Sequence, residues 1–411
     1  MIRKLLGALL TLLAISAAWA PPAAAAYSPE DGAIFNDPIG NFASPLRLMR
    51  HVEATIDSTP IGATILISTY LLDRKVTVDK LLKAAAPVVD GGRGNHVQVV
   101  MDKGIDTPQS RRLMRVLNAD NDTPLPETNE LSRAGPDGSF AYKCIDSCRG
   151  GGGNNHSKFY AFSQAGASSN IVMISSANLN RGGAYLGYND LFTMANNKGI
   201  YDKFAVIHNE MRDDTDKDGD AYTVLSSGRF EVRFFPMRNA TRLTDPVMVD
   251  LGEIRCRGAT DGAGRGGRTA INISMFFWSD ERGMYIVDRL LQLQKAGCIV
   301  SVIYGAPSNE VAAVLRHAAW QGLINLYDTR VDRNGDGQVD LRGHSKYLLI
   351  NGNYRGDTSA WQVYTGSQNW TNGALTRADE VMLGIESRPA YATYMTNWND
   401  VRRTGARKIG D

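Results

Sequence analysis

The sequence predicts an α/β protein made of two pseudo-symmetric α-β-α sandwich repeats with mixed, largely parallel sheets. Two observations predict this class. Strand-like and helix-like segments alternate along the chain, and the same order of segments occurs a second time in the other half. The chain has 411 residues, more than one hydrophobic core usually serves. We therefore expect two closely packed halves with an active site at their interface.

The first 26 residues have the layout of a secretory signal peptide. Arg3 and Lys4 precede an apolar run and a series of alanines. Small residues at the end of the run favour cleavage near Ala25 or Ala26, which predicts a secreted, extracellular protein. Without the two basic signal residues, the 45 basic residues become 43 and balance the 43 acidic ones. A near-zero mature charge argues against a non-specific nucleic-acid binder, which usually carries a basic surplus.

The first part of each repeat consists of four segments in the order strand, helix, strand, helix. This order implies right-handed crossovers and parallel pairing of the strands. In the first half the segments are 65–70, 78–82, 97–102 and 111–118, and in the second half they are 271–276, 287–291, 299–304 and 310–320.

The second part of each repeat contains a strand with His-Ser-Lys, a strand that ends in a small polar turn, and an acid at the head of an apolar run. A stretch with Pro and Asn at 234–246 separates the halves, so we predict repeat 1 at 27–240 and repeat 2 at 247–411. The three segments are 154–163, 174–180 and 189–194 in the first half, and 342–351, 365–371 and 379–384 in the second half.

Four cysteines fit two disulfides in an exported protein. Proximity along the chain favours Cys144 with Cys148 and Cys256 with Cys298, although the sequence allows three pairings. A zinc site is the alternative interpretation. It is disfavoured because Cys144 and Cys148 have no second ligand pair at the spacing of zinc fingers.

The most informative motif is His-x-Lys, which occurs at equivalent positions of both repeats. Residues i and i+2 of a strand point to the same face, so His156 projects with Lys158, and His344 projects with Lys346. A single copy fits a solvated strand end. Two copies at matching positions favour a shared site.

These residue types supply the groups that a phosphodiester reaction needs. One imidazole can attack phosphorus and form a phosphohistidine, while the other protonates the leaving oxygen and later deprotonates water. The ammonium groups and two amides can hold the non-bridging oxygens of the phosphate. No cofactor is required by this arrangement. The residues with this binding role are Lys158, Lys346, Asn178 and Asn369.

A nucleophilic imidazole needs an acceptor at its second ring nitrogen, because that acceptor fixes the tautomer. Asp190 and Glu380 follow the histidines of their own repeats by 34 and 36 residues and are predicted to supply this acceptor. A solvated acid at a strand edge is the alternative for both residues.

This arrangement resembles the phospholipase D superfamily, whose pattern is His-x-Lys, an Asp further along, and a Gly-Ser-x-Asn turn, usually present twice per active site. The resemblance covers nearly the whole mature chain. It implies metal-independent chemistry through a phosphohistidine, with His156 as the nucleophile and His344 as the general acid and base. It also gives the turn serines, Ser176 and Ser367, supporting positions in the two half-sites.

The sequence departs from the family pattern at three positions. The family's aspartate is Ser163 in the first copy and Asn351 in the second, and the first Gly-Ser is Ser175-Ser176. The resemblance implies that this aspartate has a mainly structural role. The groups that act on phosphorus are present in both copies, so the departures indicate a divergent branch.

The resemblance leaves the substrate open between phospholipids and nucleic acids. Export, a near-neutral charge and the apolar stretch 275–285 favour hydrolysis of phosphatidylcholine-type lipids at a membrane surface, giving phosphatidic acid and the free headgroup. Burial of Met275 to Trp278 in the core is the alternative interpretation of that stretch. A metal-independent endonuclease is the alternative function. A monomer should suffice, because one chain holds both half-sites.

Two acidic loops, 214–220 and 332–340, raise a third class, a non-catalytic calcium-binding protein. Both place Asp and Asn at alternate positions with Gly at the sixth, as calcium loops do, but neither has the glutamate of position twelve. Surface turns are the alternative. Calcium is therefore expected only as a structural ion, with ligands in the second loop from Asp332, Asn334, Asp336 and Asp340.

Overall fold

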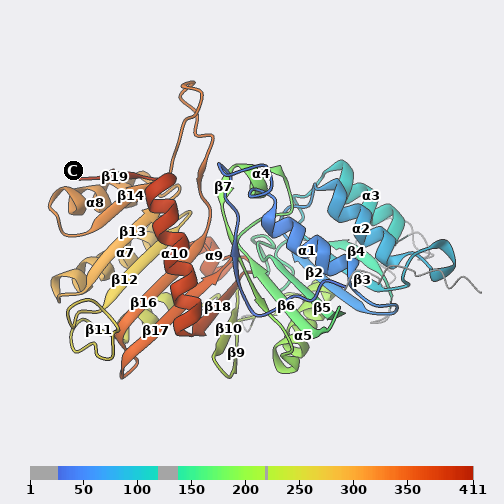
Figure 1. Ribbon diagram of the computed structural model, residues 1–411, viewed down its shortest axis with the longest axis horizontal. Coiled ribbons are helices and arrows are strands. Elements are labelled where there is room, and N and C mark those ends of the chain that lie inside the picture. Colours follow the sequence, from blue (N-terminus) through green and yellow to red (C-terminus); the bar gives the residue numbers. More distant parts are fainter. Residues whose placement is uncertain (1–25, 119–137, 218–220, 411) are drawn as a thin grey trace, which may run out of the picture.

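The computed structural model describes residues 26–118, 138–217 and 221–410. Two halves lie side by side, and each contains a sheet with helices packed against it (Figure 1). All but the last residue of the predicted signal peptide lies outside the described residues. Among the helices in the described ranges, none combines the length and the apolar character that a membrane crossing needs.

The first half is built on a sheet with the strand order β1-β8-β6-β5-β2-β3-β4. Its strands are β1 (Gly32–Phe35), β2 (Thr64–Thr69), β3 (His96–Met101), β4 (Phe140–Lys143), β5 (Phe159–Ala165), β6 (Ser168–Ser175) and β8 (Asp190–Met194). Its helices are α1 (Arg47–Asp57), α2 (Lys75–Ala85), α3 (Pro108–Leu117), α4 (Arg181–Tyr185) and α5 (Lys198–Asp213), with a short 3₁₀ helix at Val88–Asp90.

The second half is built on a sheet with the order β19-β14-β13-β12-β16-β17-β18-β10-β9, and β11 (Ile254–Arg255) pairs with β16. Its other strands are β9 (Thr223–Ser227), β10 (Phe230–Phe234), β12 (Ala270–Met275), β13 (Ile299–Tyr304), β14 (Asn325–Asp328), β16 (Lys346–Tyr354), β17 (Asp357–Gly366), β18 (Val381–Glu386) and β19 (Arg407–Ile409). Its helices are α6 (Pro246–Gly252), α7 (Asp280–Lys295), α8 (Asn309–Trp320), α9 (Asn372–Thr376) and α10 (Arg388–Thr404).

The mixed α/β class and the duplication are confirmed. Parallel pairs join β2 to β3 and β3 to β4, and in the second sheet β12 to β13 and β13 to β14. The other neighbours in both sheets pair antiparallel. The expectation of largely parallel sheets thus holds only where helical crossovers connect the strands. Strands joined by short turns, such as β5 and β6, must run in opposite directions.

The repeat boundary differs from the predicted one. β1 lies beside β8, and β10 lies beside β18, so β10 has the place in the second sheet that β1 has in the first. β9 and β10 fall inside the predicted repeat 1, yet they hydrogen-bond into the second sheet. The second repeat therefore begins between α5 and β9. The stretch 234–246 instead forms the connection from β10 to α6, a loop that local composition cannot distinguish from a linker.

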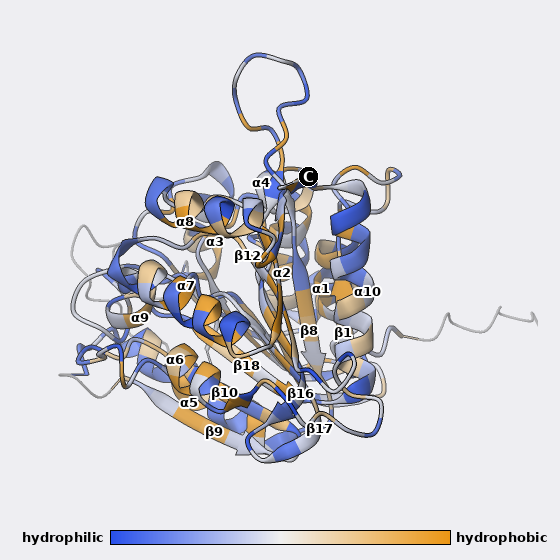
Figure 2. Ribbon diagram, turned by 90° about the vertical axis from the view of Figure 1, so that its left-hand side faces the viewer, coloured by the Kyte–Doolittle hydropathy of each residue, from blue (hydrophilic) through white to orange (hydrophobic). Residues whose placement is uncertain are grey.

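Three hydrophobic cores hold the molecule together. Helices α1, α2 and α3 cover one face of the first sheet, and α6, α7 and α8 cover one face of the second. The third core is shared, because it combines side chains of both sheets with α5 and α10, including Phe204, Tyr394 and Trp398. In Figure 2 the interior strands are largely hydrophobic, and the helices expose hydrophilic residues. Burial of this shared core fixes the two repeats against each other.

Local sequence explains where several helices begin. Thr107 and Ser110 form a capping box at the start of α3, with Pro108 at the first helical position. Asn197, Ser308 and other polar residues accept hydrogen bonds from backbone N–H groups in the first turns of later helices. These caps satisfy donors that a helix start otherwise leaves without partners.

Both predicted disulfides are present. Cys144 pairs with Cys148 just after β4, and Cys256 pairs with Cys298 at the start of β13. The first closes a small loop beside the cleft described below, and the second ties the segment after β11 to the second sheet.

Candidate active site

A cleft of about 770 Å³ lies between the repeats, as predicted for the site. Both histidines of the His-x-Lys motifs line it, together with three aromatic residues, Tyr70, Phe276 and Phe277, and the acid that follows the second motif. Lining residues used below are Tyr70, His156 and Asn178 from the first repeat, and Phe276, His344, Asn369, Arg377 and Glu380 from the second.

Each histidine is anchored to the backbone of the other repeat. The His156 N–H donates to the Asp379 carbonyl at 3.0 Å, and the His344 N–H donates to the Tyr188 carbonyl at 2.8 Å. Just before His344, β15 (Arg342–Gly343) pairs with β7 (Gly187–Tyr188) of the first repeat. The histidines therefore lie ahead of β5 and β16 and not within strands as predicted, because their backbone bonds cross the repeat interface.

His156 faces a carboxylate. Its Nδ1 lies 2.8 Å from Glu380 Oε1, and the Ser367 hydroxyl donates to Glu380 Oε2. Burial is the largest influence on His156 and lowers its pKa, while the Glu380 charge opposes this effect. A carboxylate that accepts from Nδ1–H leaves Nε2 with a free lone pair. Glu380 thus supplies an acceptor to a histidine, as predicted, but to His156 of the other repeat and not to His344 of its own.

His344 faces an amide. Its Nδ1 lies 2.8 Å from Asn189 Oδ1, so the acceptor again comes from the other repeat. The prediction that Asp190 supplies an acceptor is wrong. The Asp190 carboxylate accepts from the hydroxyls of Thr365 and Tyr394, and burial raises its pKa.

The register of the strands explains this error. Ser175 pairs with Leu191 in the first sheet, and Gly366 pairs with Met382 in the second. Counting from these pairs, Asn189 is the equivalent of Glu380, and Asp190 is the equivalent of a valine. A shift of one residue turns a side chain to the opposite face of a strand, so aligning the two acids placed Asp190 on the wrong face.

The two lysines are buried and have matching environments. Lys158 Nζ donates to the carbonyl of His156, and Lys346 Nζ donates to the carbonyl of His344 at 2.6 Å. Lys158 Nζ lies 5.1 Å from the ring centroid of Tyr70, and Lys346 Nζ lies 5.0 Å from that of Phe276. Rings at this range stabilise an ammonium group.

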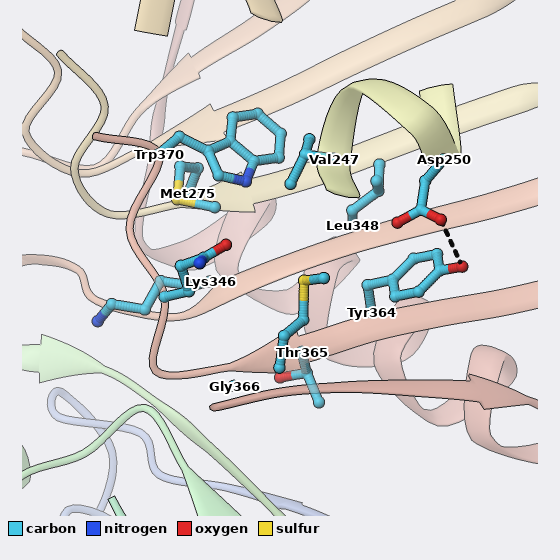
Figure 3. A pocket seen from close by; sticks show the side chains of 11 residues that line it. Val247, Asp250, Met275, Lys346, Leu348, Tyr364, Thr365, Gly366 and Trp370 are labelled. Carbon is cyan, nitrogen blue, oxygen red and sulfur yellow. Dashed lines mark hydrogen bonds between the residues drawn. The ribbon is translucent and has the colours of Figure 1, made fainter. Parts of the chain in front are cut away.

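Burial alters the charge of both lysines. It lowers the pKa of Lys158 to about 7, and it lowers the pKa of Lys346 well below its ordinary value. Figure 3 shows the Lys346 amino group pointing away from Val247, Leu348 and Trp370, which line the apolar pocket behind its stem. The apolar surroundings of the two amino groups therefore disfavour their charged form, and a bound anion would stabilise that form.

The turn residues follow the same symmetry. Ser176 Oγ donates to Asn189 Oδ1 at 3.0 Å, as Ser367 does to Glu380. The side-chain oxygens of Asn178 and Asn369 are buried without a hydrogen-bond partner in the part of the chain that the structure describes. Amides with unmet hydrogen bonds at the rim of a cleft are suited to meet a ligand.

The three departures from the family pattern have structural explanations. Ser163 Oγ accepts from the Thr64 N–H at 2.9 Å, and Asn351 Oδ1 accepts from the Gly264 N–H at 2.7 Å. Both side chains bind backbone, in keeping with a structural role. Gly366 has a φ of +146°, whereas its counterpart Ser175 has no positive φ and uses its hydroxyl to accept from the backbone.

Sequence reasoning missed Asn189 and Tyr70, and it considered Phe276 only as part of the apolar stretch 275–285. Tyr70 and Phe276 end the matching segments ILISTY and INISMF, so the repeat itself contained the signal. Their rings lie 4.9 Å from the His156 ring and 4.4 Å from the His344 ring. The apolar stretch 275–285 divides at this point: Phe276 and Phe277 line the cleft, and Trp278 is fully buried in the core.

The acidic loop at 332–340 uses its own side chains in a turn. Asp332 accepts from the N–H groups of Gly335 and Gly337, and Asp340 accepts from that of Arg333. Within the described ranges, no group of three or more His, Cys, Asp or Glu residues is arranged to hold a metal ion. Calcium binding stays a prediction for this loop.

The other acidic loop, 214–220, is described only in part, since residues 218–220 lie outside the described ranges. Asp214 accepts from the Tyr142 hydroxyl, and Asp216 pairs with Arg238. Both carboxylates therefore have protein partners.

Residues 266–401 match the family model described as "Cardiolipin synthase, PLD-like domain". No curated protein matches the chain by sequence. Phosphatidylserine synthase from Haemophilus influenzae Rd KW20 has a similar structure, with a TM-score of 0.56 and 12% identity over 92% of this chain and 88% of the other.

Polyphosphate kinase from Porphyromonas gingivalis aligns with a TM-score of 0.52 and 13% identity over 90% of this chain, which spans half the length of that kinase. Nuc from Salmonella typhimurium, titled a phospholipase D family member, matches 44% of this chain and 98% of its own at 19% identity, with a TM-score of 0.30.

The family-model match lies within the second repeat, and the similarity to the phosphatidylserine synthase over 92% of the chain shows a shared two-repeat fold. The second repeat is thus similar to a phospholipase D-like domain, in agreement with the resemblance that the paired motifs indicate.

Proposed function

We propose that the chain is a secreted, metal-independent phosphodiesterase that hydrolyses phosphatidylcholine-type lipids through a phosphohistidine. The observation that carries the proposal is the pairing of two imidazoles in one cleft, each with an acceptor 2.8 Å from Nδ1 and thus with Nε2 available. One such nitrogen can act as the nucleophile, and the other, once it has taken up a proton, can protonate the leaving oxygen without a cofactor.

In the proposed mechanism, the negative charge of the bound phosphate favours the protonated form of His344, which takes up a proton at Nε2. His156 Nε2 then attacks phosphorus while His344 Nε2 gives this proton to the leaving oxygen. A water molecule then attacks the phosphohistidine, passing a proton to His344 as the N–P bond breaks. Lys158 and Lys346 stabilise the charge that the non-bridging oxygens carry in both steps. The incoming phosphate anion restores the ammonium charge that burial disfavours.

Three features support a lipid substrate. Phe277 lines the cleft with 37% of its surface exposed, which gives the mouth an apolar contact for a lipid. The mature chain has a near-zero formal charge. The phosphatidylserine synthase of similar fold is, by its title, an enzyme of phospholipids.

A nuclease is the second candidate, and Arg377 favours it. Its exposed guanidinium lines the cleft, and it has no hydrogen bond or ion pair with the described residues. An unpaired guanidinium beside the site suits a second phosphate, which a nucleic acid always carries and phosphatidylcholine does not.

The deciding experiment measures choline release from phosphatidylcholine vesicles in excess chelator. We expect release by the mature protein and its loss in His156→Ala and His344→Ala. Cleavage of plasmid or single-stranded DNA in the same buffer, without choline release, would promote the nuclease and exclude phosphatidylcholine. A strict calcium requirement for turnover would contradict the metal-independent mechanism.

A further inference from the structure

The side-chain amide of Asn189 uses both its oxygen and its nitrogen in hydrogen bonds. Its Oδ1 faces His344 Nδ1 at 2.8 Å and also accepts from the Ser176 hydroxyl at 3.0 Å. Its Nδ2 donates to the carbonyls of Gly183 at 3.1 Å and Gly187 at 3.0 Å. Because both amide protons are committed to carbonyls, the oxygen must face the imidazole, and Nδ1 of His344 must carry the proton.

The same contacts explain why this position holds an amide and its counterpart a carboxylate. An aspartate at 189 would point an oxygen at the two carbonyl oxygens that Nδ2 now satisfies, with no proton between them. Asn189 is buried, so water cannot relieve such a contact. Glu380 has no such constraint, since it accepts from Ser367 and His156.

We propose that Asn189 is the positioning residue of His344, and that its neutral amide reserves this histidine for proton transfer while His156 takes the phosphoryl group. The inference rests on the proposed function. When His156 Nε2 bonds to phosphorus and the P–O bond to the leaving alcohol breaks, the imidazole ring retains its Nδ1 proton and a positive charge. Glu380 compensates this charge, whereas His344 Nδ1 faces a neutral amide.

The surroundings of His344 agree with a role in proton transfer rather than in phosphoryl transfer. Lys346 Nζ lies 3.2 Å from Nδ1 and 3.4 Å from Nε2, and Lys158, His156 and Arg342 add positive charge nearby. Burial and these charges lower the pKa of His344 well below its ordinary value. A protonated His344 is therefore a strong acid, which suits the protonation of a poor leaving group such as an alkoxide.

The first test reads the tautomer directly. Histidine labelled with ¹⁵N, with the His344 signals assigned from His344→Gln, should show Nδ1 protonated and Nε2 unprotonated at neutral pH. In Asn189→Ala we expect the His344 signals to move toward a mixture of tautomers. Asn118→Ala is the matched control, because Asn118 is a buried amide that bonds Ala141 away from the cleft. It should leave the His344 signals unchanged.

The second test separates proton transfer from attack. Phosphatidylcholine and phosphatidyl-4-nitrophenol share a phosphatidyl group, but nitrophenolate leaves without a proton. Because both lipids form the same phosphohistidine, the rate of the first step is compared, as pre-steady-state release of choline or nitrophenolate. Asn189→Ala should lower this rate for phosphatidylcholine at least ten times more than for the nitrophenyl lipid. If Asn189→Ala does not fold, Asn189→Ser serves in its place.

Two results would overturn the inference. Equal losses on both lipids with an unchanged tautomer would make Asn189 a purely structural residue. A wild-type protein that cleaves neither lipid would overturn the proposed function and the proton-transfer role, while the tautomer would still report whether Asn189 positions the ring.

Discussion

The two half-sites have equivalent backbone hydrogen bonds, but a different side chain faces Nδ1 of each histidine. In both, a histidine is anchored to the opposite repeat, and a lysine lies against an aromatic ring. His156 then meets the Glu380 carboxylate, whereas His344 meets the Asn189 amide at the same distance of 2.8 Å. Duplication thus supplied a symmetric frame, and a single side chain made the two imidazoles chemically different.

Removal of either histidine should have the largest effect on activity. We expect His156→Gln to abolish turnover of both phosphatidylcholine and its nitrophenyl analogue, because no nucleophile remains. His344→Gln should lose about 10²- to 10⁴-fold on phosphatidylcholine, the range typical of a general acid, and much less on the nitrophenyl lipid. Pre-steady-state rates of choline and nitrophenolate release, which report the first step alone, check this. The reverse pattern would exchange the two roles.

The acids of the two halves should respond differently to neutralisation. Glu380→Gln should lower kcat on the order of 10- to 100-fold, similar to the loss of partners that orient metal-bound histidines, because the phosphohistidine loses its compensating charge. Asp190→Asn should change kcat less, since an amide can still accept from Thr365 and Tyr394. Comparable losses in the two variants would restore Asp190 to the catalytic set.

Lysine ionisation should appear in substrate binding. Lys158, with its pKa lowered to about 7, is charged below that pH and loses its charge as the pH rises through it. We therefore expect KM to rise between about pH 6 and pH 8, the range in which such a group titrates. Lys158→Met should show a high KM at every pH, while Lys346→Met should retain the rise. A flat KM in the wild type would contradict this assignment.

The two disulfides should differ in what they stabilise. Cys256 and Cys298 are separated by 42 residues and Cys144 and Cys148 by four, so chain entropy predicts losses of about 4 and about 2 kcal/mol on removal. Urea unfolding of the paired Ser variants measures both. The smaller loop should affect activity more, because the Cys148 N–H donates to the carboxylate of Asp379, which adjoins Glu380.

Much of the site could be predicted from the repeat. His156 and His344 do lie in one cleft, and both cysteine pairs are as expected. Sequence spacing did not identify the residue equivalent to Glu380, because strand register determines that equivalence. Asn189 follows His156 by 33 residues, whereas Glu380 follows His344 by 36. The β16–β17 hairpin is longer than β5–β6, so equal spacing could not identify the equivalent residue.

The amino-acid sequence was enough to predict the duplicated α/β fold, the two His-x-Lys motifs and the types of side chain available for phosphodiester chemistry. These depend on order and periodicity, which are local properties of the chain. The pairing of each histidine with its acceptor became visible in the three-dimensional structure alone. Glu380 reaches His156 and Asn189 reaches His344 across the interface between the repeats, and such contacts arise from packing and strand register rather than from proximity in the sequence.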